Sequence, residues 1–287
     1  MNCELKRVYQ VYEASEKIYF DSLSRFVLMS DCHRGTGSLR DDFYKNKDIY
    51  SRALNYYNSK DYIYIEIGDG DELWENDNYQ EIIETHKDVY NLLASLNRRN
   101  KLYLIYGNHD VVKKDIGVVN SYLVPALGPV KIHEGLVMSM KDSDIELMLI
   151  HGHQVDFFND KLWKISRFLV RYLWGPLQML GIISPGNTSL SFCRKRTMDI
   201  KLMDWCMLEN KGLIAGHTHN FIFPQKGRVP YFNTGCCVYP EGITAIEIDN
   251  GNITLVRWFS KIFNNTTVFN REVISGPEKI QDYFSIE

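Results

Sequence analysis

The chain has 287 residues, of which 45% are hydrophobic, 24% are charged and 13% are aromatic, and its formal net charge is −3. This composition predicts a globular protein with a sizeable core and excludes a disordered chain. Since the charge is close to neutral and no long basic groove is evident, we do not expect nucleic acid as a partner.

The six cysteines indicate a reducing environment. None of them has the CxxC spacing, two are adjacent, and a chain of this length does not need disulfides to fold. The first 20 residues carry too many charges for a signal peptide. No uncharged apolar run reaches the roughly 18–20 residues of a membrane-spanning helix. We therefore expect a cytoplasmic protein.

In chain order, residues 3–20 have the apolar spacing of a helix, and we expect residues 1–23 to form an N-terminal helical element. Three apolar strands follow, within 25–31, 62–72 and 101–106, with helices over about 42–58 and 79–97 between them. This alternation predicts an α/β sheet whose loops at the carboxyl ends of the strands carry the ligands.

The pattern changes after residue 135. A hairpin is predicted over 136–153 with its turn at 142–144, and another strand lies within 212–220. The segments 229–235, 243–249 and 253–259 predict a second set of strands, which we expect to be antiparallel. Residues 261–287 are expected to form a C-terminal tail.

Residues 154–211 predict a helical insert between two strand ends that carry histidines. Nine basic and five acidic residues give it a net charge of +4, which leaves −7 for the rest of the chain. Lys164, Arg167 and Arg171 recur at helical spacing beside aromatic residues. The pattern fits an amphipathic helix that packs on its own domain, and it equally fits a surface for substrate or membrane.

Six of the eight histidines closely follow apolar strands. The candidate ligands at these strand ends are Asp31, His33, Asp69, Asn108, His151, His217 and His219. Carboxylate, amide and imidazole donors together suit Mn²⁺, Fe or Zn²⁺. Seven donors are too many for one tetrahedral ion, so they predict two ions that share a carboxylate, polarise a phosphoryl group and activate water.

His109 lies one residue beyond a candidate ligand and is expected to point elsewhere in the same cavity. It is predicted to be the acid that protonates the leaving oxygen, with Asp110 as its orienting partner. Arg34 is expected either to contact phosphate or to be solvated. Asp71 and Glu72 are interpreted as loop solvation or as helix N-terminal charge.

The five blocks DCH (31–33), GDGDE (68–72), GNHD (107–110), HGH (151–153) and GHTH (216–219) resemble, in this order, those of the calcineurin-like metallophosphoesterases. The resemblance implies a four-layer αββα sandwich over residues 24–260, with the helical insert near the active site. One metal ion would be held by Asp31, His33, Asp69 and His219. The other would be held by Asp69, Asn108, His151 and His217, with His109 as the catalytic imidazole. Two Mn²⁺ ions are expected, with Fe or Zn²⁺ as alternatives.

The insert and the segment 231–258 are similar to the UDP-2,3-diacylglucosamine pyrophosphatase branch of this superfamily. This similarity implies hydrolysis of a phosphodiester or diphosphate bond in a phosphorylated small molecule or a nucleotide-sugar lipid, with peripheral membrane contact through the insert. Cys32, the loop 34–40 and His153 depart from the pattern of that branch.

Other functions stay open. Within enzymes, the alternatives are a cyclic-nucleotide or nucleic-acid phosphodiesterase and a phosphoprotein phosphatase. In another class, the alternative is a non-catalytic scaffold of the same fold that binds partners through a degenerate metal site.

Overall fold

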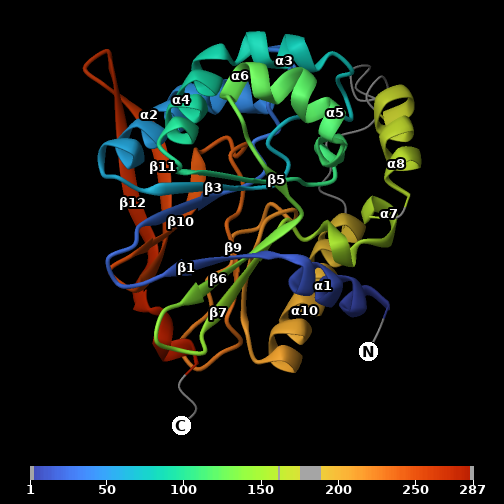
Figure 1. Cartoon of the computed structure of the whole chain (residues 1–287). Coiled ribbons are helices and arrows are strands. Elements are labelled where there is room, and N and C mark those ends of the chain that lie inside the picture. The colour runs from blue at the N-terminus through green and yellow to red at the C-terminus, as the bar shows by residue number, and fades with distance from the viewer. Residues whose placement is uncertain (1–2, 161, 175–188, 285–287) are drawn as a thin grey trace.

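The computed structural model describes residues 3–160, 162–174 and 189–284. Among these residues the strands form two sheets (Figure 1). The five-stranded sheet has the order β1-β6-β7-β8-β9, with β1 Glu16–Phe20, β6 Gly135–Met140, β7 Glu146–Ile150, β8 Gly212–Ala215 and β9 Tyr231–Asn233. The seven-stranded sheet has the order β12-β11-β10-β2-β3-β4-β5, with β2 Phe26–Met29, β3 Ile63–Ile67, β4 Leu102–Ile105, β5 Ile132–His133, β10 Ile243–Asp249, β11 Asn252–Phe263 and β12 Thr266–Lys279.

The helices cover the outer faces of the two sheets. The seven-stranded sheet is covered by α2 Asp42–Ser59, α4 Lys87–Arg98 and α6 Val124–Leu127, and the five-stranded sheet by α1 Cys3–Ala14 and α10 Ser189–Glu209 (Figure 1). The remaining helical segments are α3 Tyr79–Thr85, η1 Val111–Lys114, α5 Ile116–Val118, η2 Val119–Leu123, η3 His153–Val155, α7 Phe157–Asp160, α8 Trp163–Leu169, η4 Val170–Trp174 and η5 Ile280–Tyr283.

One hydrophobic core lies between the two sheets, and a larger one lies between the seven-stranded sheet and its helices. Between the two sheets, Leu28 and Ile65 of the seven-stranded sheet pack against Leu149 and Ile214 of the five-stranded sheet, and all four are fully buried. All four residues of β2 are buried, as expected for a central strand that is covered on both faces. The predicted four-layer α/β sandwich is confirmed.

The N-terminal helix is shorter than predicted. It ends at Ala14, and the sequence EKIYF then forms β1, which pairs in parallel with β6. Ile18 and Phe20 are buried while Lys17 and Tyr19 are exposed, so the alternation with period two decides the structure here. The prediction of a helix over 16–20 is wrong.

The C-terminal strands also differ from the prediction. β10 and β11 are antiparallel, but β10 pairs with β2 and so extends the first sheet, whereas β9 pairs in parallel with β8 in the other sheet. The segment expected as a tail contains β12, which pairs with β11 along most of its length.

The helix predicted over 79–97 is two helices that meet at His86. This residue has φ −109° and ψ 31°, and it is both the C-cap of α3 and the N-cap of α4. Its buried ring contacts Asp41 at 3.0 Å, and Asp41 in turn caps the N-terminus of α2 through the backbone N–H of Tyr44. The packing of His86 therefore fixes the break.

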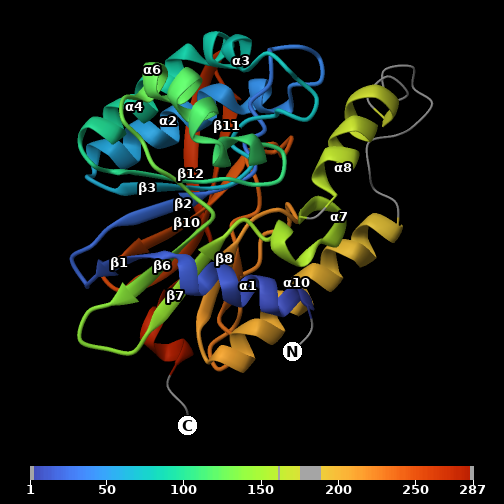
Figure 2. The same cartoon turned by 45° about the vertical axis from the view of Figure 1, so that its right-hand side comes forward.

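The described residues of the insert are helical, as predicted. In Figure 2, α8 extends away from the two sheets, whereas α10 packs on the five-stranded sheet. Arg171 of η4 joins the insert to the body, since its guanidinium donates to the carbonyls of Leu73, Trp74 and Asn76. In the part of the chain that the structure describes, no helix is both long enough and apolar enough to cross a membrane.

Candidate metal centre

The predicted ligands gather at one edge of the sandwich because the carboxyl ends of strands from both sheets meet there. Asp31 and His33 follow β2, Asp69 follows β3, and Asn108 and His109 follow β4, while His151 follows β7, and His217 and His219 follow β8. The loops are joined by backbone hydrogen bonds, from the N–H of Asp31 to the carbonyl of Gly68 (3.1 Å) and from the N–H of His33 to that of Asp69 (2.9 Å).

The backbone at this edge has an uncommon conformation. Five of the seven candidate ligands have positive φ, namely Asp31 (53°), His33 (49°), Asp69 (50°), His217 (67°) and His219 (56°). Non-glycine residues rarely adopt this region, and such strained residues concentrate at functional sites.

Two glycines allow the loops to approach closely. A Cβ atom on Gly107 would lie 2.1 Å from Oδ1 of Asp69, and one on Gly216 would lie 2.5 Å from Oδ2 of Asp31. Glycine is therefore favoured before Asn108 and before His217, because a side chain at either position would clash with a carboxylate of a neighbouring loop.

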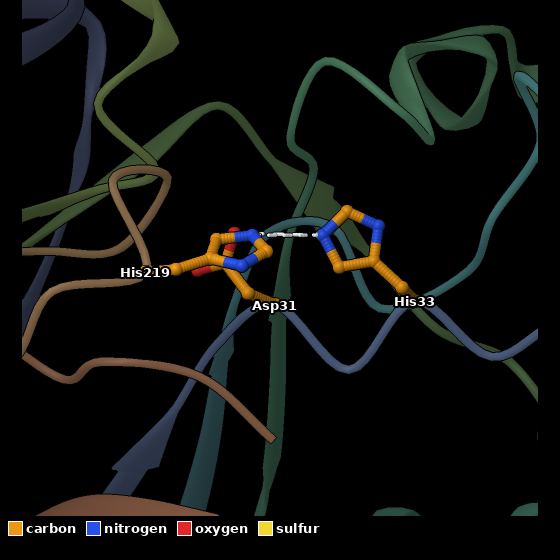
Figure 3. Close-up of side chains that lie close together, drawn as sticks. All are labelled: Asp31, His33 and His219. Carbon is orange, nitrogen blue, oxygen red and sulfur yellow. Dashed lines mark hydrogen bonds and ion pairs between the residues drawn. The ribbon is translucent and has the colours of Figure 1, made fainter. Parts of the chain in front are cut away.

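The first group of donors contains Asp31, His33 and His219, whose nearest ligand atoms lie within 4.8 Å of one another. Figure 3 shows the rings of His33 and His219 pointing toward each other from different loops. Their Nε2 atoms are 3.1 Å apart, and Oδ1 of Asp31 is 3.1 Å from Nε2 of His219. Since two nitrogen lone pairs would repel at this distance, a proton or a cation must lie between them.

The second group contains Asp69, His151 and His217. Nδ1 of His151 donates to the carbonyl of Ile67 (2.9 Å), which leaves Nε2 facing Oδ2 of Asp69 at 3.0 Å. Oδ2 of Asp69 is also 3.8 Å from Nε2 of His33, so this carboxylate lies between the two groups.

The donors fit divalent cations. Within the described residues, the buried Oδ1 of Asn108 makes no hydrogen bond, while Oδ1 of Asp31 and Nε2 of His151 have only the ion-pair contacts with His219 and Asp69 given above. A buried polar atom without a partner costs about 1–3 kcal/mol, and such atoms are otherwise uncommon. Carboxylate, amide and imidazole atoms that converge in this way could hold two ions.

Electrostatics favour charged groups here despite burial. Burial opposes ionisation of Asp31, but the neighbouring His219 and His151 outweigh it and hold the pKa of Asp31 well below its usual value. Burial likewise disfavours the cation of His151, but Asp69 and Asp31 raise its pKa to about 9. The carboxylates therefore attract positive charge to the centre of the site, which a divalent cation can supply in place of the proton.

His109 faces the same site, but its partner is not the one predicted. Its Nδ1 donates to Oε1 of Glu72 (2.8 Å), and its ring stacks on Trp74 with centroids 4.2 Å apart. Oε2 of Glu72 also accepts from Nδ1 of His33 (2.8 Å), so one carboxylate orients two imidazoles. The interpretation of Glu72 as loop solvation is therefore wrong.

Asp110 has a different position. Its carboxylate accepts from the backbone N–H groups of Gly70 (3.0 Å) and Gly107 (2.7 Å) and from Nζ of Lys113 (2.5 Å). It thus ties the loop after β3 to the loop after β4, and Glu72 replaces it as the residue that orients His109.

Arg34 does not contact the cavity. It is 1% exposed, its terminal nitrogens donate to both oxygens of Glu66 (2.7 and 2.8 Å), and its Nε donates to Asp71 (2.7 Å). Neither the predicted phosphate contact nor the solvated alternative is correct, because the guanidinium is used in a buried ion-pair network beneath the site.

The structure adds Glu72 and Asp156 to the candidates. Asp156 lines the same cavity of about 220 Å³ as Asp69, Asn108 and His109, and its Oδ2 is 3.7 Å from Nε2 of His217. Glu72 lies inside the GDGDE block and could have been found there. Asp156 lies three residues after the HGH block, at the start of the insert. Its closeness to that block is the one feature of the sequence that could have identified it as a site residue.

A calcineurin-like phosphoesterase family model matches residues 24–221. The chain belongs to the calcineurin-like phosphoesterase family. The matched region of this phosphoesterase contains all five sequence blocks and the insert. The domain limits of 24–260 stay a prediction. Comparison with curated protein sequences gave no significant match.

Three of the solved structures that match this chain have low sequence identity to it. Vacuolar protein sorting 29 from Cryptosporidium parvum is 12% identical, with a TM-score of 0.39 over 88% of this chain and 98% of the other. Vps29 complexed with Zn²⁺ from Entamoeba histolytica is 14% identical, with a TM-score of 0.38 over 88% and 99%. A cold-active protein-tyrosine phosphatase of a Shewanella species is 12% identical, with a TM-score of 0.41 over 92% and 84%. Similarities this distant say nothing about activity.

Proposed function

We propose that the chain is a phosphoesterase that hydrolyses a phosphodiester or diphosphate bond with two bound divalent cations. The observation that carries the proposal is the position of Asp69, whose Oδ2 faces His151 (3.0 Å) on one side and His33 (3.8 Å) on the other. A carboxylate between two imidazole-rich groups is the arrangement that a dinuclear centre needs.

In the proposed site, Asp31, His33, Asp69 and His219 hold one cation, and Asp69, Asn108, His151 and His217 hold the other. When bound, the cations supply Lewis-acid activation of the phosphoryl group and lower the pKa of the attacking water. We assign Mn²⁺ as the first choice because the donors are hard oxygens mixed with imidazole, with Fe and Zn²⁺ as alternatives.

His109 is proposed as the acid that protonates the leaving oxygen. Since Nδ1 is bound to Glu72, Nε2 is the atom available to the cavity. The ring is held on two sides by Glu72 and Trp74, and this fixes the direction of proton donation.

We further propose a phosphorylated small molecule or a nucleotide-sugar lipid as the substrate. Support comes from α8 and η4, where Phe168 (60%) and Tyr172 (61%) are exposed close to Lys164 and Arg167. An exposed aromatic surface with basic residues suits peripheral contact with an anionic membrane. A peripheral cytoplasmic location follows from this proposal.

The direct test combines metal content with hydrolysis of bis-p-nitrophenyl phosphate in Mn²⁺. The native protein should bind two ions and turn the ester over. Asp69→Asn should lose metal and at least a thousandfold in kcat, while His109→Ala should keep the metal and lose about 10²–10⁴-fold. Lys45→Gln, an exposed residue of α2, is the control.

Two results would contradict the proposal. Turnover that persists unchanged in both site variants would remove the assignment of the site. Metal binding without turnover of any phosphoester would favour the non-catalytic scaffold instead.

A further inference from the structure

A cavity of about 670 Å³ adjoins the candidate metal centre. It lies between α10 and the segment that follows β8, and it shares Lys195 and His219 with the 220 Å³ cavity of the metal centre. A molecule whose phosphorus lies at the metal centre can therefore extend into the larger cavity past these two residues.

The mouth of the larger cavity is basic. Lys195 and Arg196 line it from α10, and neither has an ion-pair partner among the residues that the structure describes. Its acidic lining residue, Asp199, is buried and accepts hydrogen bonds from the hydroxyls of Tyr231 (2.6 Å) and Thr218 (3.3 Å). Lys195 interacts electrostatically with Asp199, but neither cation makes an ion pair with a described residue inside the cavity, so an anionic ligand can bind them.

One wall of the cavity is apolar. Ile200 and Met203 line it from α10, and Ile222 lines it from the opposite segment. Ile200 is 47% exposed, so a bound ligand would remove apolar surface from water. Such burial favours binding. Tyr239 also lines the cavity, and its hydroxyl donates to the carbonyl of His219.

We propose that this cavity binds the part of the substrate that is not attacked, and that this part carries a second anionic group next to an apolar segment. The inference rests on the proposed phosphoester hydrolysis and specifies its substrate class. A second anion binds at Lys195 and Arg196, and the apolar segment lies against Ile200, Met203 and Ile222. Simple phosphodiesters with two small neutral substituents use the metal centre alone.

The test uses three p-nitrophenyl phosphodiesters that release the same chromophore and differ in the second substituent, which is ethyl, octyl or 2-phosphonoethyl. With the Mn²⁺-loaded protein, we expect kcat/KM to be at least tenfold higher for the octyl and phosphonoethyl esters than for the ethyl ester. Arg196→Glu should lower the phosphonoethyl preference at least tenfold and keep the octyl preference. Met203→Gln should lower the octyl preference at least threefold.

Arg52→Glu on the exposed face of α2 is the matched control and should leave both preferences unchanged. Thermal unfolding of each variant confirms that it is folded. If the native protein hydrolyses the ethyl ester but shows no preference, or if both cavity variants keep the native preferences, the cavity inference is wrong and the proposed function stands. If none of the three esters is hydrolysed with metal bound, the proposed function fails and this inference fails with it.

Discussion

Nδ1 of His109 lies 2.8 Å from Oε1 of Glu72, and this contact fixes the imidazole that we propose as the catalytic acid. The same carboxylate reaches Nδ1 of His33 through its other oxygen, so Glu72 joins a candidate metal ligand to the proposed acid. Burial raises the pKa of Glu72, but the two imidazoles outweigh this effect and hold the pKa well below its usual value. Glu72 is therefore ionised in the folded protein.

Glu72→Gln should lower kcat on bis-p-nitrophenyl phosphate by about 10–100-fold, because residues that orient ligands and catalytic groups have effects of this size. KM should change less than kcat, since Glu72 does not contact the substrate. Glu75→Gln, three residues further along the chain, is the control and should be close to native. Equal kinetics for the two variants would show that Glu72 does not position His109.

Arg34→Met should destabilise the fold by about 3–5 kcal/mol, since it leaves Glu66 and Asp71 as buried charges without their main partner. Denaturant unfolding of the metal-free protein measures this loss. If the variant instead has native stability and a KM raised severalfold, Arg34 contacts the phosphate, as the sequence predicted.

Asn108→Leu should have opposite effects on the metal-free and metal-loaded proteins. Since Oδ1 of Asn108 is buried without a hydrogen bond among the described residues, removing it should leave the metal-free protein equally stable or slightly more stable. In the native protein, Mn²⁺ at 100 times its Kd should add about 2.7 kcal/mol per site, and the variant should lose one of these two increments.

Thermal unfolding with EDTA and with Mn²⁺, together with metal analysis, separates the two effects. One ion per chain in the variant and two in the native protein is the expected stoichiometry. An unchanged Mn²⁺-induced rise in Tm would exclude Asn108 as a ligand.

Asp199 should make the stability of the metal-free protein depend on pH. Burial raises the pKa of Asp199 from its ordinary value of 3.8 to about 6, although the hydrogen bonds from Tyr231 and Thr218 lower it. Below about pH 4, the group is protonated in both the folded and unfolded states. Between about pH 4 and 6, the folded protein retains a proton that the unfolded chain has lost, so stability falls as pH rises, by roughly 3 kcal/mol at most.

Asp199→Asn cannot ionise. The free energy of unfolding of the variant minus that of the native protein should therefore increase by up to roughly 3 kcal/mol between pH 4 and pH 7. Urea unfolding at several pH values measures this difference, with the exposed Asp48→Asn as the control. A difference that is constant with pH would contradict the raised pKa.

The sequence blocks predicted the donors, but not their partners. Asp31, Asp69 and His151 could be identified because each directly follows an apolar strand, and strand ends meet at one edge of an α/β sheet. Which carboxylate reaches His109 depends on the path of the loops. Glu72 and Asp110 were equally close to the block pattern, and only the distances separate them.

The periodicity of apolar residues likewise predicted only part of the fold. It identified β2, β3 and β4 because continuous apolar runs mark buried parallel strands. It assigned 16–20 to a helix because the two periods overlap in a short segment, and the burial of Ile18 and Phe20 against the second sheet decided otherwise. The break at His86 and the pairing of β10 with β2 likewise depend on contacts with distant segments.

By itself, the sequence determined the chemistry that is available, because residue type and distance from a strand end are local properties. The tertiary structure decided which groups share a proton, which are buried in ion pairs and which cavity lies beside them. Arg34 shows the difference most clearly, since its position next to a candidate ligand is local, while the carboxylates that bind it come from β3 and from the loop that follows β3. Side-chain direction and burial arise only when distant segments pack together.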